Sequence, residues 1–378
     1  MTVSPRRFHP RHLVARLSKA FGREKPQQVT HAPHRGSKKI NLALQGGGAH
    51  GAFTWGVLDH LLGDDRLAIE GISGASAGAV NAVVLADGLA RGGPEEARRR
   101  LGEFWRAASR DGNLPEAQRK VVDRLFWFLP MAASPAQAWF DMLSQYLSPY
   151  DLNPLNINPL RDLVKRFVDF DAIRACPNPL FVSATNVQTG RLRIFPREKI
   201  TAEVVAASAC LPMLFRAVEI DGVPYWDGGY MGNPPLSPLV KTTECDDVLI
   251  VQINPLERLA VPTSAKEIMN RINEITFNSS LMAELHTIAV VNQSIGQGRR
   301  TIRPDGRKYR PIHIHRIVLP HHGNGFDADS KLNTDYDFFQ RLHQMGRRAA
   351  RRFLDAHFDD IGARGTVDLK AEVRAEWA

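Results

Sequence analysis

The sequence predicts an α/β fold with three layers, in which helices cover both faces of a mainly parallel central sheet. Two observations predict it. Between residues 40 and 89, short apolar segments of strand length alternate with longer segments of helical periodicity. Further apolar segments of strand length follow at 179–186, 248–254 and 313–319. Alternation of strands and helices is typical of a parallel sheet, because each helix carries the chain back to the edge where the next strand starts.

The first part of the chain supplies four elements. A cluster of glycines over residues 46–51 joins the first strand to the first helix, which places Phe53, Val57 and Leu61 on one side. That spacing is typical of a helix that packs against a sheet. In order, we expect a strand over 40–45, a helix over 49–62, a strand over 67–73 and a helix over 77–89.

The later elements follow the same logic. The strand at 179–186 is expected to turn back at Thr189-Gly190 and form a hairpin with 191–195. A helix over 201–209 ends near Pro212, because proline does not continue a helix. A final helix over 335–357 carries an apolar stripe, which indicates core packing. The 378 residues suffice for one large domain or two ordinary ones.

Residues 101–165 are expected to form a helical insertion. Large aromatic side chains are frequent over 101–150, and Pro130, Pro135 and Pro149 interrupt the segment. These side chains fit two interpretations, a plain core or a mobile cover over an apolar cleft. The expected organisation is a basic, mostly disordered arm over 1–38, a main α/β domain over 39–255 that contains this insertion, and a C-terminal helical extension over 256–378 packed on that domain.

The positive charge is concentrated in the N-terminal arm. Residues 1–40 hold ten Lys or Arg and one Glu, which accounts for the whole net charge of +9. The rest of the chain is electrically balanced, so a nucleic-acid partner is not indicated. Within the arm, His12 to Arg23 has the spacing of a short basic amphipathic helix. This pattern predicts peripheral contact with an anionic membrane or granule surface; the alternative is a solvated tail.

The cellular setting follows from the cysteines and from hydropathy. Cys176, Cys210 and Cys245 are odd in number and widely spaced, which argues against a disulfide framework or a metal site. The longest uncharged segment, 40–58, is interrupted by polar residues and glycines, and we expect no membrane span and no secretory signal. A cytoplasmic protein without a metal or cofactor is therefore expected.

A serine motif lies where the second predicted strand meets the second helix. Gly74-Ala75-Ser76-Ala77-Gly78 has the form G-x-S-x-G of a nucleophile elbow, a tight strand-to-helix turn that exposes the serine hydroxyl. The glycine cluster at 46–51 offers backbone N–H groups for the oxyanion that forms when a serine attacks an ester. Together the two segments indicate acyl transfer, provided that a base is present.

Asp227 is the better candidate for that base. No histidine lies in an obvious catalytic signature, although His286 and the pair His313 and His315 remain alternatives in a Ser-His-Asp arrangement. Asp227 begins the segment Asp-Gly-Gly, in which two glycines allow a sharp turn. A carboxylate is a weak base at its free pKa of about 3.9, and a cleft that excludes water would raise that value.

Three blocks in this order resemble the patatin-like phospholipases. The blocks are Gly46–Gly51, Gly74–Gly78 and Asp227–Pro234, and the segment 207–212 also resembles a recurring part of that family. The resemblance covers roughly residues 40–240. It implies a lipid acyl hydrolase of phospholipase A type, which acts through an acyl-enzyme on a lipid or other ester substrate.

The resemblance also implies roles for single residues. Ser76 is the nucleophile and Asp227 its base, in a dyad without histidine. The implied oxyanion donors are the backbone N–H groups of Gly46, Gly47, Gly48 and Ala77. The glycines that support the motifs are Gly74, Gly78, Gly228 and Gly229.

Several alternatives stay open on the sequence alone. The substrate could instead be an intracellular polyester or a neutral lipid, because apolar pockets discriminate chain length poorly. Gly46, Gly48 and Gly51 also satisfy G-x-G-x-x-G, and Glu70 lies where a ribose-binding acid is expected, which would suit a nucleotide-binding oxidoreductase. A hydrolase-like scaffold without activity, bound to a surface through the basic arm, is a third hypothesis.

Overall fold

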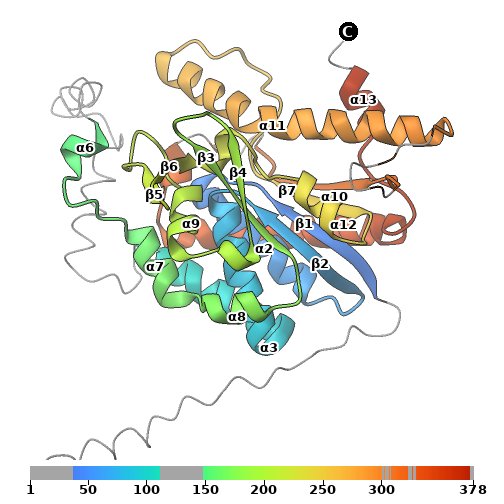
Figure 1. Ribbon diagram of the computed structural model, residues 1–378, viewed down its shortest axis with the longest axis horizontal. Helices are drawn as coiled ribbons and strands as arrows, with labels where there is room; N and C mark the ends of the chain where they lie inside the picture. Colours follow the sequence, from blue (N-terminus) through green and yellow to red (C-terminus); the bar gives the residue numbers. More distant parts are fainter. Residues whose placement is uncertain are drawn as a thin grey trace, which may run out of the picture.

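The computed structural model describes residues 37–110, 148–299, 302, 306, 308–321, 326 and 329–374. The basic arm, apart from its last residues, and most of the aromatic segment lie outside these ranges, so both remain predictions. Figure 1 shows a central sheet with helices on both faces. Within the described ranges, no helix is both long and apolar enough to pass through a bilayer.

Eight strands form the sheet, in the order β5-β6-β3-β2-β1-β7-β8, with β4 paired to β3 off this path. Four strand pairs are parallel and three, all in the β3 to β6 region, are antiparallel. The expected three-layer fold with a mainly parallel sheet is confirmed. The strands are β1 Lys38–Leu44, β2 Leu67–Gly74, β3 Leu180–Asn186, β4 Leu192–Pro196, β5 Val218–Ile220, β6 Val223–Asp227, β7 Asp247–Gln252 and β8 His313–Val318.

Each face of the sheet has its own apolar core. Helices α2, α3 and α12 cover one core, and α10, α11 and α13 cover the other. Strand β1 serves both, because Leu42 and Leu44 point into the first core and Ala43 into the second. The helices are α2 Gly51–Leu62, α3 Ala77–Ala108, α6 Pro149–Leu152, α7 Pro159–Phe167, α8 Phe170–Ala175, α9 Ala202–Ser208, α10 Ser237–Thr242, α11 Ala265–Gly296, α12 Tyr336–His357 and α13 Leu369–Arg374.

Helix α3 corrects the expected boundary of the insertion. It begins at Ala77 as predicted and breaks at Gly92 and Gly93, where the backbone is not helical, before a second helical segment continues to Ala108. Residues 101–108 therefore continue a core helix, and the side chains of Phe104 and Trp105 are buried in the main core. Of the remaining aromatic residues of the proposed cover, Tyr150 is described and exposed, and the others lie between 111 and 147, outside the described residues.

The C-terminal part is more than a helical extension. Strand β8 pairs in parallel with β7 and so enlarges the central sheet. Helix α12 packs along α2 (Figure 1) at a very short distance, because each helix offers a glycine at the crossing. A Cβ on Gly56 would lie 1.9 Å from the His343 carbonyl oxygen, and one on Gly346 would lie 2.1 Å from that of Phe53.

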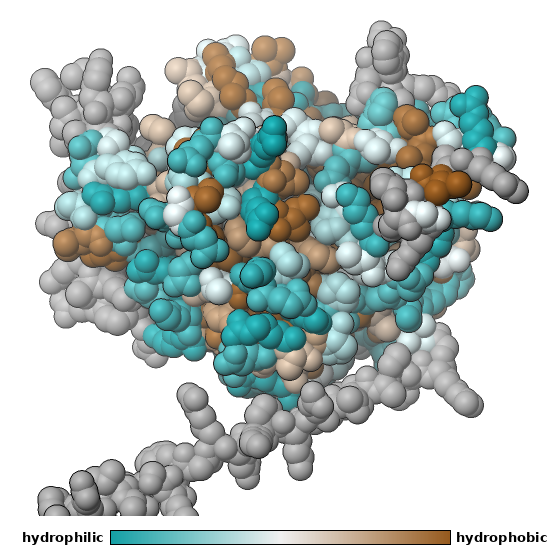
Figure 2. Space-filling model, in the orientation of Figure 1, coloured by the Kyte–Doolittle hydropathy of each residue, from teal (hydrophilic) through white to brown (hydrophobic). Residues whose placement is uncertain are grey.

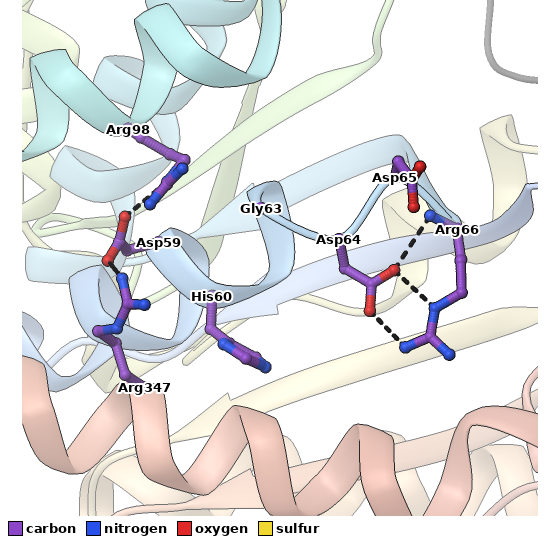
Figure 3. Close-up of a pocket in the computed structure, with 8 residues that line it drawn as sticks. All are labelled: Asp59, His60, Gly63, Asp64, Asp65, Arg66, Arg98 and Arg347. Carbon is purple, nitrogen blue, oxygen red and sulfur yellow. Dashed lines mark hydrogen bonds and ion pairs between the residues drawn. The ribbon is translucent and has the colours of Figure 1, made fainter.

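A charged network also joins α2 to its neighbours. Figure 3 shows Asp59 of α2 between Arg98 of α3 and Arg347 of α12, at the wall of a surface pocket of about 440 Å³. His343 of α12 lies 3.2 Å from the same carboxylate. Burial alone would raise the pKa of Asp59, but hydrogen bonds from His343, Arg98 and Arg347 outweigh it and hold the pKa well below its usual range.

We predict that Asp59→Asn lowers the free energy of unfolding by about 2 kcal/mol at pH 7, because three cationic or polar partners lose a shared carboxylate. Asp64→Asn, at the rim of the same pocket, is the matched control and should cost less than about 1 kcal/mol, since its partner Arg66 is exposed. Denaturant unfolding measures both.

The same pair of variants gives a pH test. The folded-state pKa of Asp59 is depressed, so its contribution is fully present above about pH 4 and is lost as pH falls through the folded pKa. The stability gap between wild type and Asp59→Asn should therefore shrink below about pH 4. Equal stability of the two proteins at pH 7 would contradict the role of this network.

Candidate functional site

The serine motif forms the turn between β2 and α3. Strand β2 ends at Gly74, and Ser76 stands directly before the first residue of α3. The Ser76 backbone has φ 53° and ψ −124°, in the left-handed region that a residue with a side chain rarely occupies. The strained turn places a nearly buried hydroxyl, 7% exposed, at the positive end of the α3 dipole.

The two outer glycines of the motif are required by close packing. A Cβ on Gly74 would lie 2.5 Å from the carbonyl oxygen of Gly78. A Cβ on Gly78 would lie 2.0 Å from the carbonyl oxygen of Leu44, at the end of β1. Because Leu44 and Gly74 are paired in the sheet, the turn is pressed against the start of the glycine loop.

Ser208 fixes the elbow from the other side. The Ser76 N–H donates a hydrogen bond of 2.9 Å to the Ser208 hydroxyl, which is fully buried at the end of α9. The sequence pointed to the surrounding segment only through its family resemblance, and gave no signal for this contact.

Strand β3 brings Asp227 to the serine. Strand β4 pairs with residues 181–185 along one edge of β3, so β2 and β6 share its other edge. On that edge Val182 pairs with Gly74 and Ala184 pairs with Asp227. Two residues of a strand span about 7 Å. Asp227 therefore ends β6 just beyond the point where β2 turns into the elbow.

Three hydrogen bonds and one close backbone contact hold the turn at Asp227. Its N–H donates to the Cys210 carbonyl at 2.8 Å, and its own carbonyl accepts from the Thr185 hydroxyl at 2.8 Å. Carboxylate Oδ1 accepts from the Gly229 N–H at 2.7 Å. Gly228 is needed because a Cβ would lie 2.2 Å from the Ser183 carbonyl oxygen.

The surroundings of Asp227 change its acidity. Burial raises the pKa of Asp227 to about 7, although the Gly229 N–H, the Ser76 hydroxyl and the charge of Lys331 each lower it. Among the described residues, Oδ2 has no hydrogen-bond partner of ordinary geometry. The site thus holds a fully buried carboxylate with one free oxygen, close enough to the Ser76 hydroxyl for that group to affect its pKa.

Two asparagines hold the glycine loop between β1 and α2. Asn233 Oδ1 accepts from the Gly46 N–H at 2.6 Å, and Asn254 Nδ2 donates to the Gly46 carbonyl at 2.7 Å. The side-chain oxygen of Gln45 accepts from the backbone N–H groups of Ile253 and Asn254 at 2.8 and 2.7 Å. The loop is therefore fixed by the chain that follows β6 and β7.

This arrangement corrects the expected set of oxyanion donors. The N–H of Gly46 is already bonded to Asn233 and is not free for an oxyanion. The N–H groups of Gly47, Gly48 and Ala77 have no acceptor among the described residues. Gly46 has a different use, because a Cβ there would lie 2.5 Å from Cβ of Ser76.

The structure does not bring His313 and His315 to the serine. His313 and His315 lie on β8 beside the start of β7, the end of the sheet away from the elbow, and His315 pairs with Asp247 at 2.9 Å. His50 is buried, with Nε2 2.7 Å from the Ser330 hydroxyl. Among the described residues, no histidine is hydrogen-bonded to Ser76.

Gly48 gives a direct test of the loop. Its φ is +59°, and a Cβ would lie 2.3 Å from the Lys331 carbonyl oxygen. We predict that Gly48→Ala lowers the free energy of unfolding by at least about 3 kcal/mol, since backbone strain and a clash add. Gly190→Ala is the matched control, with φ +65° and open space, and should cost about 1 kcal/mol. Equal losses in denaturant unfolding would refute the close contact.

Comparison with solved structures finds several matches at low sequence identity. VipD from Legionella pneumophila is 14% identical, with TM-score 0.38, over 85% of this chain and 67% of its own. ExoU of Pseudomonas aeruginosa, in its complex with SpcU, is 14% identical, with TM-score 0.35, over 87% and 52%. Human GIVD cytosolic phospholipase A2 is 11% identical, with TM-score 0.39, over 89% and 60%. The chain thus spans about half to two thirds of the length of these proteins.

Comparison with protein families is decisive. No curated protein sequence matches the chain. Residues 42–240, just over half of the chain, match the family described as patatin-like phospholipase. The matched range contains the glycine loop, the serine elbow and the Asp227 turn, the blocks on which the resemblance was based. The chain belongs to the patatin-like phospholipase family, and this membership supports lipid hydrolase activity.

Proposed function

We propose that the protein is a lipid acyl hydrolase of phospholipase A type, with Ser76 as nucleophile and Asp227 as base. One observation supports this most strongly: a fully buried carboxylate with a free oxygen lies beside a strained serine at a helix N-terminus. Burial gives Asp227 a pKa near neutrality, where a carboxylate is an effective general base.

The reaction begins when the Ser76 oxygen attacks the ester carbonyl while Asp227 takes the hydroxyl proton. The tetrahedral oxyanion faces the N–H groups of Gly47, Gly48 and Ala77, and each such donor is worth about 3 kcal/mol in the transition state. Asp227 returns the proton to the departing alcohol, which leaves Ser76 acylated. A water molecule, deprotonated by Asp227, then attacks the acyl-enzyme, and Asp227 returns this proton to the Ser76 oxygen as the fatty acid leaves.

An exposed apolar surface near the Asp227 turn favours a lipid substrate. Helix α11 crosses this turn at Phe277, whose ring would lie 2.4 Å from a Cβ on Gly229. Over the two to three turns before Phe277, α11 exposes large apolar side chains on one side, and Figure 2 shows hydrophobic residues at the edge where Figure 1 places α11. Exposed apolar patches of this kind mark contact with other molecules or with lipid. The side chains are Ile268, Met269, Ile272 and Ile275.

The nucleotide-binding alternative finds no support at the glycine loop. Glu70 lies within β2, and its carboxylate pairs with Lys39 at 3.2 Å and accepts from the Glu244 N–H at 2.7 Å. It is therefore engaged away from the loop, near the start of the parallel strands, whereas nucleotides bind at their carboxyl ends.

We predict that Ser76→Ala and Asp227→Asn each lower kcat/KM for ester hydrolysis by at least about 10³-fold, because the nucleophile and its base act as a unit. His286→Ala is the control and should stay within about threefold of wild type. The measurement is a panel of phospholipids, neutral glycerides, aliphatic polyesters and short soluble esters. Activity that survives Ser76→Ala would place the reaction elsewhere, and loss of activity in the histidine variant would favour a histidine base.

The pKa of Asp227 predicts a pH dependence. Because the base acts in its ionised form, kcat/KM for a soluble neutral ester should rise about tenfold per pH unit below pH 7 and level off near pH 7. Initial rates in buffers from pH 5 upward measure this rise. A rate that is constant from pH 5 to pH 7 would contradict the assignment of a buried carboxylate as base.

A further inference from the structure

A lysine outside the family match reaches the glycine loop. Lys331 lies in the short helix η4 (Asp329–Leu332), about ninety residues beyond the end of the matched range. Its ammonium donates a hydrogen bond of 2.7 Å to Asn254 Oδ1. Among the described residues, no carboxylate lies within 4.0 Å of this ammonium. Lys331 is therefore a partly buried cation that has an amide as its direct partner.

Two contacts place η4 directly on the loop. The Lys331 carbonyl oxygen would lie 2.3 Å from a Cβ on Gly48, so the two backbones touch. The Ser330 hydroxyl lies 2.7 Å from Nε2 of His50, in the short helix η1 (Gly48–His50) that continues the loop. The position of Lys331 is thus set by the same segment that offers the free N–H groups.

Asn254 carries the effect of the ammonium to the loop. An ammonium can only donate, so the Asn254 side-chain oxygen must face Lys331. The amide nitrogen then faces the other way, where it donates to the Gly46 carbonyl at 2.7 Å. A rotated Asn254 would lose both contacts. Lys331 therefore selects the orientation of Asn254 that holds the backbone of the glycine loop.

The charge of Lys331 also acts on the site. Burial lowers the pKa of Lys331 to about 8, Glu274 of α11 and Asp227 raise it, and Arg258 lowers it. Glu274 is itself paired with Arg258 and with Arg271, at 2.5 and 3.2 Å. The ammonium is therefore only partly neutralised, and its charge lowers the pKa of Asp227.

We propose that Lys331 is a positioning residue for ester hydrolysis: its ammonium orients Asn254, which fixes the glycine loop, and places positive charge beside the oxyanion that this loop binds. The inference rests on the proposed Ser76–Asp227 reaction. It assigns to the C-terminal part of the chain a role that the family match, ending at residue 240, does not include.

If Lys331 acts in this way, the pH profile of kcat/KM has a second, descending limb. Lys331 loses its charge as pH rises through about 8, so kcat/KM should fall again above that pH. Four described groups that face Asp227 or Lys331 have pKa values shifted away from this range. Cys210 and Tyr230, which also face Asp227, have pKa values raised by burial to about 12. His50 and His321, which face Lys331, have pKa values lowered by burial and stay neutral in this range.

The test compares Lys331→Met and Lys331→Arg with wild type on a soluble neutral ester from pH 5.5 to 9.5. Lys331→Met should lower kcat about 10- to 100-fold with KM within about threefold, lose the upper limb and move the lower limb to higher pH. Lys331→Arg keeps the charge, so it should recover kcat to within about fivefold and lose the upper limb. Lys199→Met, an exposed lysine of η2 (Arg197–Lys199), is the control and should match wild type.

The outcomes separate this inference from the proposed function. If Ser76→Ala is inactive while Lys331→Met keeps wild-type kcat and both limbs, the role of Lys331 is refuted and the hydrolase remains. If wild type is inactive or Ser76→Ala stays active, both proposals fall. If Lys331→Met does not fold by circular dichroism, Lys331→Arg decides: an upper limb unchanged near pH 8 in that variant refutes the assignment.

Discussion

The edge of β3 that β2 and β6 share is the constraint on which the site depends. A strand edge has room for one partner at a time, so along β3 the pairing with β2 must stop before the pairing with β6 starts. Their ends therefore meet, and the chain leaves β2 through the Ser76 turn just where β6 ends at Asp227. About 150 residues of sequence separate the two groups, yet two residues of one strand set their spacing. The antiparallel pairing of β6 with β3, which departs from the otherwise parallel sheet, thus brings Asp227 to the turn that carries Ser76.

Segments that follow the family match cover the site where Ser76 and Asp227 lie close together, and both residues are buried. Phe277 of α11 packs on the Asp227 turn, and Lys331 of η4 packs on the glycine loop. A carboxylate excluded from water becomes a stronger base, which is the property that a dyad without histidine needs. Side-chain amides satisfy the buried backbone of the loop, so the exclusion of water leaves Gly46 fully bonded. Residues far apart in the sequence thus exclude water from the site and also bond the buried backbone groups of Gly46.

Local patterns predicted the local features. The apolar run of β1, the hairpin at Gly190 and the elbow at Ser76 follow from spacing and turn chemistry, and all lie where the sequence placed them. Features that depend on tertiary pairing could not be predicted. Nothing in the sequence shows that the Gly46 N–H is taken by Asn233, or that Ser208 supports the elbow, since these contacts join segments more than 130 residues apart. The sequence suggested the direction of the pKa shift of Asp227, and the burial of this residue in the folded protein causes the shift.

The most direct test of the central claim is covalent labelling of the protein with an alkyl fluorophosphonate, which phosphonylates an activated serine. Peptide mapping by mass spectrometry locates the label, and the labelling rate is followed against pH. We expect the label at Ser76 alone. Its rate of labelling should rise through about pH 7, and Asp227→Asn should abolish the labelling. A label on another residue, or a labelling rate at Ser76 that Asp227→Asn leaves unchanged, would contradict it.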